Sequence, residues 1–138
     1  MTLSEELLNN LNEAYNYVND IVKKPIPIAV ILGTGLGKLA EYVKVEHSIS
    51  YADIPHFPTS TVESHAGRLL VGKLEGKDVV VMQGRFHYYE GYPMREITFP
   101  VRVMRKMGAK NLLLSNAAGG LNPQYREGEL MLMDDHIN

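Results

Sequence analysis

The sequence predicts a single-domain α/β protein. Three short apolar runs, 28–32, 79–82 and 111–115, have the pattern of strands that are covered on both faces. Two further segments, 3–22 and 94–107, place apolar residues at helical spacing. The length of 138 residues fits one domain built around one core.

The composition argues against several classes of protein. The net charge is −2, so nothing indicates a nucleic acid or an anionic membrane surface as partner. No apolar run approaches membrane-spanning length, and the acidic, amphipathic N-terminus is unlike a secretory signal. The chain contains no cysteine, which excludes disulfides and thiolate zinc sites. The expected location is the cytoplasm.

The first expected element is a helix over residues 3–22. Thr2 and Glu5 have the spacing of a capping box, which places its start. Pro25 and Pro27 then favour an extended segment, because the residue before a proline is restricted to extended conformations. This segment leads into the first apolar strand.

A glycine-rich turn, 33–37, follows that strand directly, and residues 38–43 can open a helix. Strand, glycine turn and helix together can aim backbone N–H groups at a phosphate. The glycines are too closely spaced for a P-loop, and G-x-G-x-G does not match the dinucleotide fingerprint. The residues alone leave two interpretations open, an anion site and a simple chain reversal.

The middle of the chain combines strands with a long polar segment. Residues 45–51 can form a strand, and residues 68–74 and 77–82 have the pattern of a hairpin. The segment 53–67 between them is polar, and loops of this length in compact domains are usually functional or mobile. It contains His65, two residues before a glycine that lets the backbone approach a ligand. A lone loop histidine is nevertheless more often solvated.

The loop at 83–92 carries a concentrated set of polar groups after a strand. Arg85 offers a planar fork of donors that suits an oxyanion. His87 can donate to an anion or move a proton near neutral pH, and three tyrosines present flat faces with a polar tip. At the carboxyl end of a strand, such a set suits a small anionic or sugar-bearing ligand. Ordinary loop hydrogen bonding is an equally open interpretation.

The helix expected at 94–107 contains an interruption. Pro93 suits a first helical position and Gly108 suits the end. Pro100 lacks a backbone N–H and is unfavourable inside a helix. The helix therefore either kinks, or begins near Thr98 with Pro100 in its first turn.

The strand at 111–115, expected to be buried, leads into small and polar residues at 116–123. Backbone groups in this loop can face a ligand, although a tight packing corner gives the same pattern. Residues 129–133 are expected to form a last apolar strand. Asp-Asp-His at 134–136 consists of metal-ligand types, but three consecutive residues rarely converge on one ion. We therefore expect no metal site.

Three loops thus follow strands: 33–37, 83–92 and 116–122. In an open sheet, loops at the carboxyl ends of strands can lie side by side. Their convergence is a stronger indication of a ligand site than any one loop alone.

Four motifs together resemble the purine nucleoside phosphorylases of the trimeric type. They occur in family order and cover essentially the whole chain: Gly33-Thr34-Gly35-Leu36-Gly37, His65-Ala66-Gly67-Arg68, Gly84-Arg85-Phe86-His87-Tyr88-Tyr89-Glu90-Gly91-Tyr92 and Asn116-Ala117-Ala118-Gly119-Gly120-Leu121-Asn122. The related methylthioadenosine phosphorylases share the fold and the first turn. They usually differ at the Arg-Phe-His and Asn-Ala-Ala-Gly-Gly motifs.

The resemblance implies a mixed, twisted sheet flanked by helices, of the phosphorylase/hydrolase-like kind. It implies reversible phosphorolysis, in which a purine ribonucleoside or deoxyribonucleoside and inorganic phosphate give the free base and the sugar 1-phosphate. Phosphate is then a co-substrate, and neither cofactor nor metal is required. The partners implied are nucleoside and phosphate, with a homotrimer as the full-length assembly.

The resemblance also implies roles for individual residues. Those expected to be at the phosphate are Thr34, His65, Arg85, His87 and the backbone N–H of Ala117. Those expected to border ribose or base are Tyr89, Ala117, Ala118 and Gly119. His87 and Glu90 are expected to serve catalysis, with Glu90 in a supporting role. Tyr88 and Tyr92 are expected to pack within the protein.

The sequence departs from the family pattern in two respects. Ser64 stands where the family usually has glycine. The chain also ends at Asn138, about halfway along a family member, so residues 1–138 are expected to form the N-terminal half of one phosphorylase domain. Alone, this half is expected to be weakly active or inactive. A methylthioadenosine-type enzyme and a non-catalytic phosphate- or nucleoside-binding relative remain the alternatives.

Overall fold

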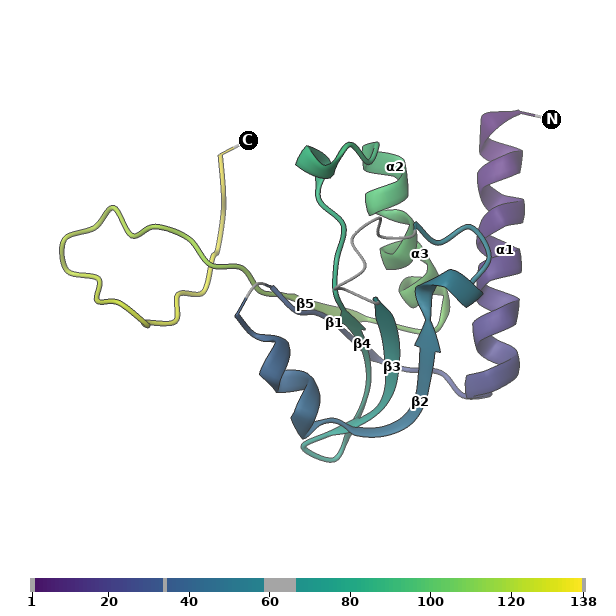
Figure 1. The fold of residues 1–138 in the computed structure, drawn as a ribbon, viewed down its shortest axis with the longest axis horizontal. Helices are drawn as coiled ribbons and strands as arrows, with labels where there is room; N and C mark the ends of the chain where they lie inside the picture. Colours follow the sequence, from purple (N-terminus) through teal and green to yellow (C-terminus); the bar gives the residue numbers. More distant parts are fainter. Residues whose placement is uncertain (1, 34, 59–66, 138) are drawn as a thin grey trace.

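The computed structural model describes residues 2–33, 35–58 and 67–137, and its core is a five-stranded mixed sheet with flanking helices (Figure 1). The helices and strands, in chain order, are α1 (Leu3–Val22), β1 (Ile28–Ile31), η1 (Gly37–Tyr42), β2 (Lys44–Ser50), η2 (Tyr51–Asp53), β3 (Arg68–Leu74), β4 (Lys77–Gln83), η3 (Tyr88–Glu90), α2 (Met94–Ile97), α3 (Phe99–Lys106) and β5 (Asn111–Leu114). The predicted α/β class, with a mixed sheet between helices, is confirmed.

The sheet order β2-β3-β4-β1-β5 explains how the loops are brought together. β1 pairs in parallel with β4 on one side and with β5 on the other, so that Ile31 lies opposite both Met82 and Leu114. β3 runs antiparallel to both β2 and β4. The carboxyl ends of β1, β2, β4 and β5 therefore share one edge of the sheet, as predicted for the three loops after β1, β4 and β5.

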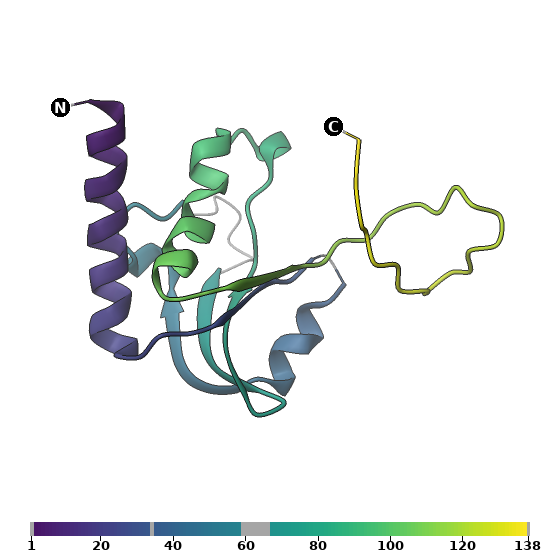
Figure 2. The same ribbon diagram turned by 180° about the vertical axis from the view of Figure 1, so that it is seen from behind.

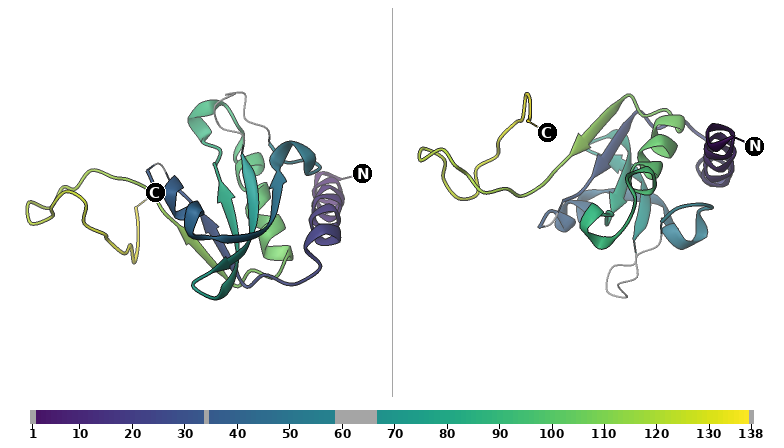
Figure 3. Two further views of the ribbon diagram at one scale, coloured as in Figure 1. Left: turned by 60° about the horizontal axis from the view of Figure 1, so that its bottom comes forward. Right: turned by 90° about the horizontal axis from the view of Figure 1, so that it is seen from above.

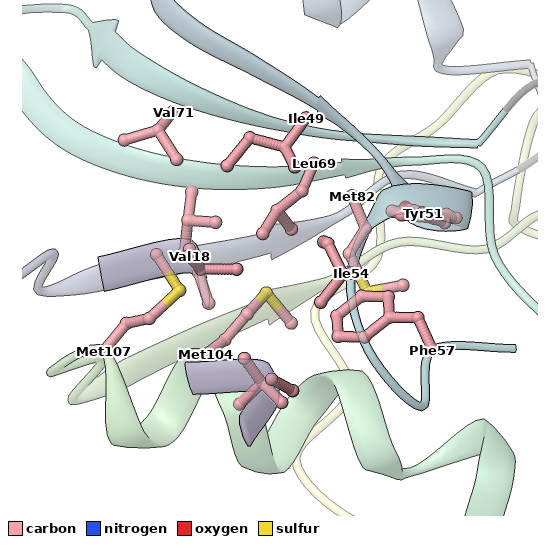
Figure 4. Packing of buried hydrophobic residues seen from close by; sticks show 14 of the residues in the cluster. Val18, Ile49, Tyr51, Ile54, Phe57, Leu69, Val71, Met82, Met104 and Met107 are labelled. Atoms are coloured by element: carbon pink, nitrogen blue, oxygen red, sulfur yellow. The ribbon is translucent and has the colours of Figure 1, made fainter. Parts of the chain in front are cut away.

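One face of the sheet is covered by α1 and α3 (Figures 1 and 2). The predicted capping box fixes the start of α1, since the Thr2 hydroxyl accepts from Glu5 N–H and the Glu5 carboxylate accepts from Thr2 N–H. Val18 of α1 and Met104 of α3 pack against sheet residues such as Leu69 in the main core (Figure 4). Burial of these apolar side chains, more than helix propensity, holds both helices on the sheet.

The other face is covered by η1. Ala40 and Val43 pack there against Val30 and Val81. The helix expected at 38–43 is a short 3₁₀ segment, and its N-cap residue Leu36 provides no side-chain hydrogen bond. An uncapped segment of six residues is too short to form a stable α-helix.

The interrupted helix of the sequence consists of two pieces, α2 and α3, that meet at Thr98. Pro100 lies in the first turn of α3, where its missing N–H removes no helical hydrogen bond. The Thr98 hydroxyl donates to the Met94 carbonyl at 2.9 Å at the end of α2. The alternative with a helix start near Thr98 is therefore confirmed, with one extra turn of helix before it.

Two expectations for the end of the chain are wrong. The strand at 111–115 was expected to be buried, but β5 is an edge strand, and Leu113 and Leu114 are 56 % and 66 % exposed. Residues 129–133 form no strand and lie on an extended segment that projects away from the sheet (Figure 3). A strand needs a neighbouring backbone for its hydrogen bonds, and the part of the chain described here offers residues 129–133 none.

A cluster of ion pairs joins the segment after α1 to the sheet. Lys24 Nζ lies 3.0 Å from the Asp78 carboxylate and 2.7 Å from that of Glu46, and Lys73 Nζ also lies 3.0 Å from Asp78. Hydrogen bonds from Lys24 and then Lys73 hold the pKa of Asp78 below its ordinary value.

Among the described residues, no helix is both long and apolar enough to cross a membrane.

Candidate functional site

Ser115, directly after β5, joins the loops that follow β1, β4 and β5. Its hydroxyl accepts a hydrogen bond from the Gly33 backbone N–H at 2.9 Å, and its carbonyl accepts one from Arg85 Nη1 at 3.0 Å. Its own N–H donates to the Ile31 carbonyl at 3.3 Å and continues the pairing with β1. One residue at the shared edge therefore fixes the relative positions of all three loops.

Gly33 is required by this close approach of the loops. A Cβ atom at this position would lie 2.2 Å from the Ser115 carbonyl oxygen, well inside van der Waals contact. The start of the glycine turn is therefore pressed against the end of β5. Thr34, the candidate phosphate residue that follows, lies outside the described residues, as does His65.

Arg85, His87 and Glu90 form a chain of hydrogen bonds. Arg85 Nε donates to His87 Nε2 at 2.9 Å, and His87 Nδ1 is paired with a Glu90 carboxylate oxygen. A neutral imidazole with its proton on Nδ1 satisfies both contacts, because Nε2 then accepts from Arg85 and Nδ1 donates to Glu90. A guanidinium has five N–H groups. Within the described ranges, two of those on Arg85 are engaged, with His87 and Ser115, and the other three are available to a ligand.

The three tyrosines of the 83–92 loop have different environments. Tyr89 is 82 % exposed, and its ring stacks on that of His87 with centroids 4.8 Å apart. Tyr92 packs edge-on against the buried Phe86 at 5.4 Å, as expected. Tyr88 was expected to pack but is 71 % exposed, so this expectation is wrong. It lies in the short 3₁₀ segment η3, in which none of the three residues is buried.

The small residues after β5 form an exposed loop. Ala117, Ala118 and Gly119 are all exposed and belong to no regular element. The Asn116 side-chain amide donates to the Ala117 carbonyl at 3.4 Å. Backbone groups in this loop are therefore open to solvent, two residues beyond the Ser115 carbonyl that holds Arg85.

Sequence reasoning missed two residues of this site, Ser115 and Tyr51. Ser115 was identified only as the end of a strand, although a hydroxyl directly before a loop of small residues is a usable signal. Tyr51 is buried beside the loop after β4, and its hydroxyl donates to the Gly84 carbonyl at 2.8 Å. Burial raises the pKa of this phenol. Nothing in the sequence indicates this contact.

Asp-Asp-His at 134–136 is the segment with residues of metal-ligand type. In the described ranges, no group of three or more histidine, aspartate or glutamate side chains is arranged to hold a metal ion. The Asp135 carboxylate accepts a hydrogen bond from the His136 backbone N–H at 2.8 Å, as expected for a loop.

Fold and site together define an α/β protein whose polar groups gather at the carboxyl edge of a mixed sheet. The chain belongs to the phosphorylase superfamily, whose family model matches residues 27–138. This membership confirms the fold that the four sequence motifs implied.

Known purine nucleoside phosphorylases are similar to this chain. Purine nucleoside phosphorylase 1 of Geobacillus stearothermophilus is 51 % identical over 128 residues, which are 93 % of this chain and 47 % of the relative. The Bos taurus enzyme is 54 % identical over 111 residues, 80 % of this chain and 38 % of the relative.

A solved structure shows the same similarity in three dimensions. Isoform 2 of purine nucleoside phosphorylase from Schistosoma mansoni superposes with a TM-score of 0.82 at 41 % identity, covering 88 % of this chain and 42 % of that one. This chain thus spans about half the length of the relatives that it matches.

Proposed function

We propose that this chain forms the phosphate- and ribose-binding part of an enzyme that cleaves purine nucleosides with inorganic phosphate. The products are the free purine and ribose 1-phosphate or deoxyribose 1-phosphate. The relatives named purine nucleoside phosphorylase support this proposal, as does the Schistosoma mansoni structure, which holds ribose-1-phosphate. Because the chain spans about half of each relative, we assign residues 1–138 to the N-terminal half of one catalytic domain.

The bracing of Arg85 is the observation that supports this function best. The guanidinium is held on one side by His87 and on the other by Ser115, at the edge of the sheet where the loops meet. Its remaining N–H groups suit the oxygens of a phosphate. Each charge-assisted hydrogen bond of this kind contributes about 1.5–3 kcal/mol. A preorganised guanidinium can therefore bind phosphate firmly, and it does so without protonating it.

The proposed chemistry follows from the charge that develops during the reaction. Breaking the glycosidic bond builds positive charge on the sugar ring. A phosphate dianion held beneath the ring stabilises that charge and then bonds to the anomeric carbon, while the bonding electrons leave with the purine. The protein therefore has to place phosphate and stabilise the leaving base.

The residues divide between these tasks. We assign phosphate binding to Thr34, His65, Arg85, His87 and the backbone N–H of Ala117. His87 and Glu90 serve catalysis, with the Glu90 carboxylate keeping the His87 ring oriented. We assign the exposed Tyr89 to the ribose, and Ala117, Ala118 and Gly119 to the border of the nucleoside.

The reaction transfers a glycosyl group to phosphate and has no redox step. We therefore propose inorganic phosphate as the co-substrate, with no further cofactor. The cytoplasm is the proposed location and a homotrimer the proposed assembly of the full-length enzyme.

Phosphate binding by the chain tests the site directly. Titration calorimetry should show phosphate binding that Arg85→Ala abolishes, because the braced guanidinium provides the main charge. Arg102→Ala is the matched control, since Arg102 is an exposed arginine on α3, outside the site. Unchanged binding by Arg85→Ala would remove Arg85 from the site.

Phosphorolysis is tested in two forms of the protein. Incubated alone with inosine and phosphate, the chain should release little hypoxanthine. A chimera in which it replaces the matching part of the Geobacillus stearothermophilus enzyme should release hypoxanthine readily. An inactive but folded chimera would favour a non-catalytic phosphate-binding relative, and a preference for methylthioadenosine over inosine would favour the other phosphorylase type.

A further inference from the structure

Tyr51 supports the chain on both sides of Arg85. The residue is 3 % exposed, and its hydroxyl donates to the Gly84 carbonyl at 2.8 Å. Gly84 has a φ of 96°, which residues other than glycine rarely adopt. This positive-φ turn directly precedes Arg85, so the hydroxyl of Tyr51 holds the point at which the loop leaves β4.

The ring of Tyr51 holds the residue on the other side. Its centroid lies 5.6 Å from that of Phe86, which is 6 % exposed. The ring also contacts that of Phe57, with centroids 5.6 Å apart (Figure 4). The two chain neighbours of Arg85 are thus both held by a single tyrosine, one through its hydroxyl and one through its ring.

Tyr51 also meets the start of β3. Its backbone N–H donates to the Gly67 carbonyl at 3.1 Å, and a Cβ at Gly67 would lie 2.2 Å from the tyrosine ring. The side chain is therefore tightly enclosed where the end of β2, the start of β3 and the loop after β4 meet. A side chain that is packed this closely has little room to move, so it keeps the loop that it contacts in place.

We propose that Tyr51 is a positioning residue for the anion site, and that its buried hydroxyl fixes the Gly84 turn and so aims the Arg85 guanidinium at the ligand. The identity of the ligand as phosphate rests on the proposed function. The contacts themselves do not, because they join Tyr51 to the Gly84 carbonyl and the Phe86 ring within the protein. The phenol stays a neutral donor through the working pH range, since burial raises its pKa.

Tyr51→Phe tests this role, because it removes the hydroxyl and keeps the ring packing. Phosphate affinity should fall about fivefold, the effect of losing one hydrogen bond. Tyr15→Phe is the matched control, since it removes a half-buried hydroxyl that donates to Asn19 on α1, away from the site. In an Arg85→Lys background, Tyr51→Phe should have no further effect, because the guanidinium that it aims is absent.

A second measurement needs no phosphate. The Arg85 Nε–H resonance in a ¹H–¹⁵N spectrum of the free chain reports the hydrogen bond to His87, and Tyr51→Phe should shift and broaden it while Tyr15→Phe does not. If the wild-type chain bound no phosphate, the proposed function would fail, and this resonance would still decide the role of Tyr51. An unchanged Arg85 resonance in Tyr51→Phe would overturn the proposal, as would an equal loss of affinity in Tyr15→Phe.

Discussion

At the scale of single residues, hydrogen bonds between the loops organise the site. The Ser115 hydroxyl accepts from the Gly33 N–H, and its carbonyl accepts from Arg85. Its N–H donates to the Ile31 carbonyl. Arg85 in turn has N–H groups that no other described residue engages. A guanidinium fixed in advance loses little conformational entropy when an anion binds.

Ser115→Ala should weaken phosphate binding about fivefold, because the Gly33 N–H loses its acceptor and the glycine turn is no longer tied to β5. The Ser115 carbonyl remains, so Arg85 keeps that contact. Titration calorimetry on the chain measures the change. Ser115→Thr keeps the hydroxyl and should bind phosphate like the wild type; equal losses in the two variants would contradict a role for this hydroxyl.

The residues that the sequence reveals at this scale are those that lie close together along the chain. Arg85, His87 and Glu90 fall within one loop of ten positions, so their association could be predicted from local spacing. The hydroxyl of Ser115 before a loop of small residues is a local signal, but its contacts could not be predicted in this way, because these partners lie 30 and 82 residues away. Its role depends on the register between β1 and β5, which local patterns do not specify.

At the scale of elements, the site depends on how closely the loops after β1 and β5 approach. The parallel pairing ends with Ile31 opposite Leu114, and the next residue along, Ser115, still donates its N–H to the Ile31 carbonyl. No side chain fits between them at Gly33. The glycine at position 33 is therefore a packing requirement, and an anion site at this turn stays a prediction.

Gly33→Ala should lower the free energy of unfolding by about 1–3 kcal/mol, the usual cost of forcing extra atoms into a packed site. Phosphate binding should fall with it, because the methyl group would push the turn away from Ser115. Urea denaturation and calorimetry measure the two effects. Gly37→Ala is the control, since a Cβ there meets no atom within 4 Å and its φ is not positive. A Gly33→Ala variant as stable as Gly37→Ala would show that the loops separate at no cost.

Elements with local start and stop signals could be predicted closely. The bounds of α1 match the expected 3–22, and the hairpin of β3 and β4 extends only one residue beyond its expected bounds, because capping and turn residues define their ends. The break between α2 and α3 could be predicted because Pro100 is unfavourable inside a helix. The segment 38–43 was expected to open a helix but is a short 3₁₀ segment. Packing of Ala40 and Val43 holds it in place, and no side-chain cap fixes its start.

At the scale of the whole molecule, burial could not be predicted from apolar character alone. The runs at 28–32 and 111–115 have the same pattern, yet β1 lies between two strands and β5 forms an edge. The apolar segment at 129–133 likewise carries Leu130 and Leu132 at 98 % and 95 % exposure. A pattern of apolar residues shows that a segment can be buried, whereas actual burial depends on which other elements reach it.

The exposed edge of β5 should make the isolated chain self-associate. In the part of the chain that the structure describes, its backbone is unpaired on one side, and Leu112, Leu113 and Leu114 add exposed apolar surface. This combination favours edge-to-edge pairing. Leu113→Lys should shift the chain toward monomer in sedimentation velocity runs across a concentration series, because a lysine on an edge strand opposes pairing. Leu8→Lys is a matched control, because Leu8 is 58 % exposed against 56 % for Leu113 but lies on the helix α1 and on no strand. If both lysine variants reduced association equally, general charge repulsion would be its cause, and the free edge of β5 would have no special part in it.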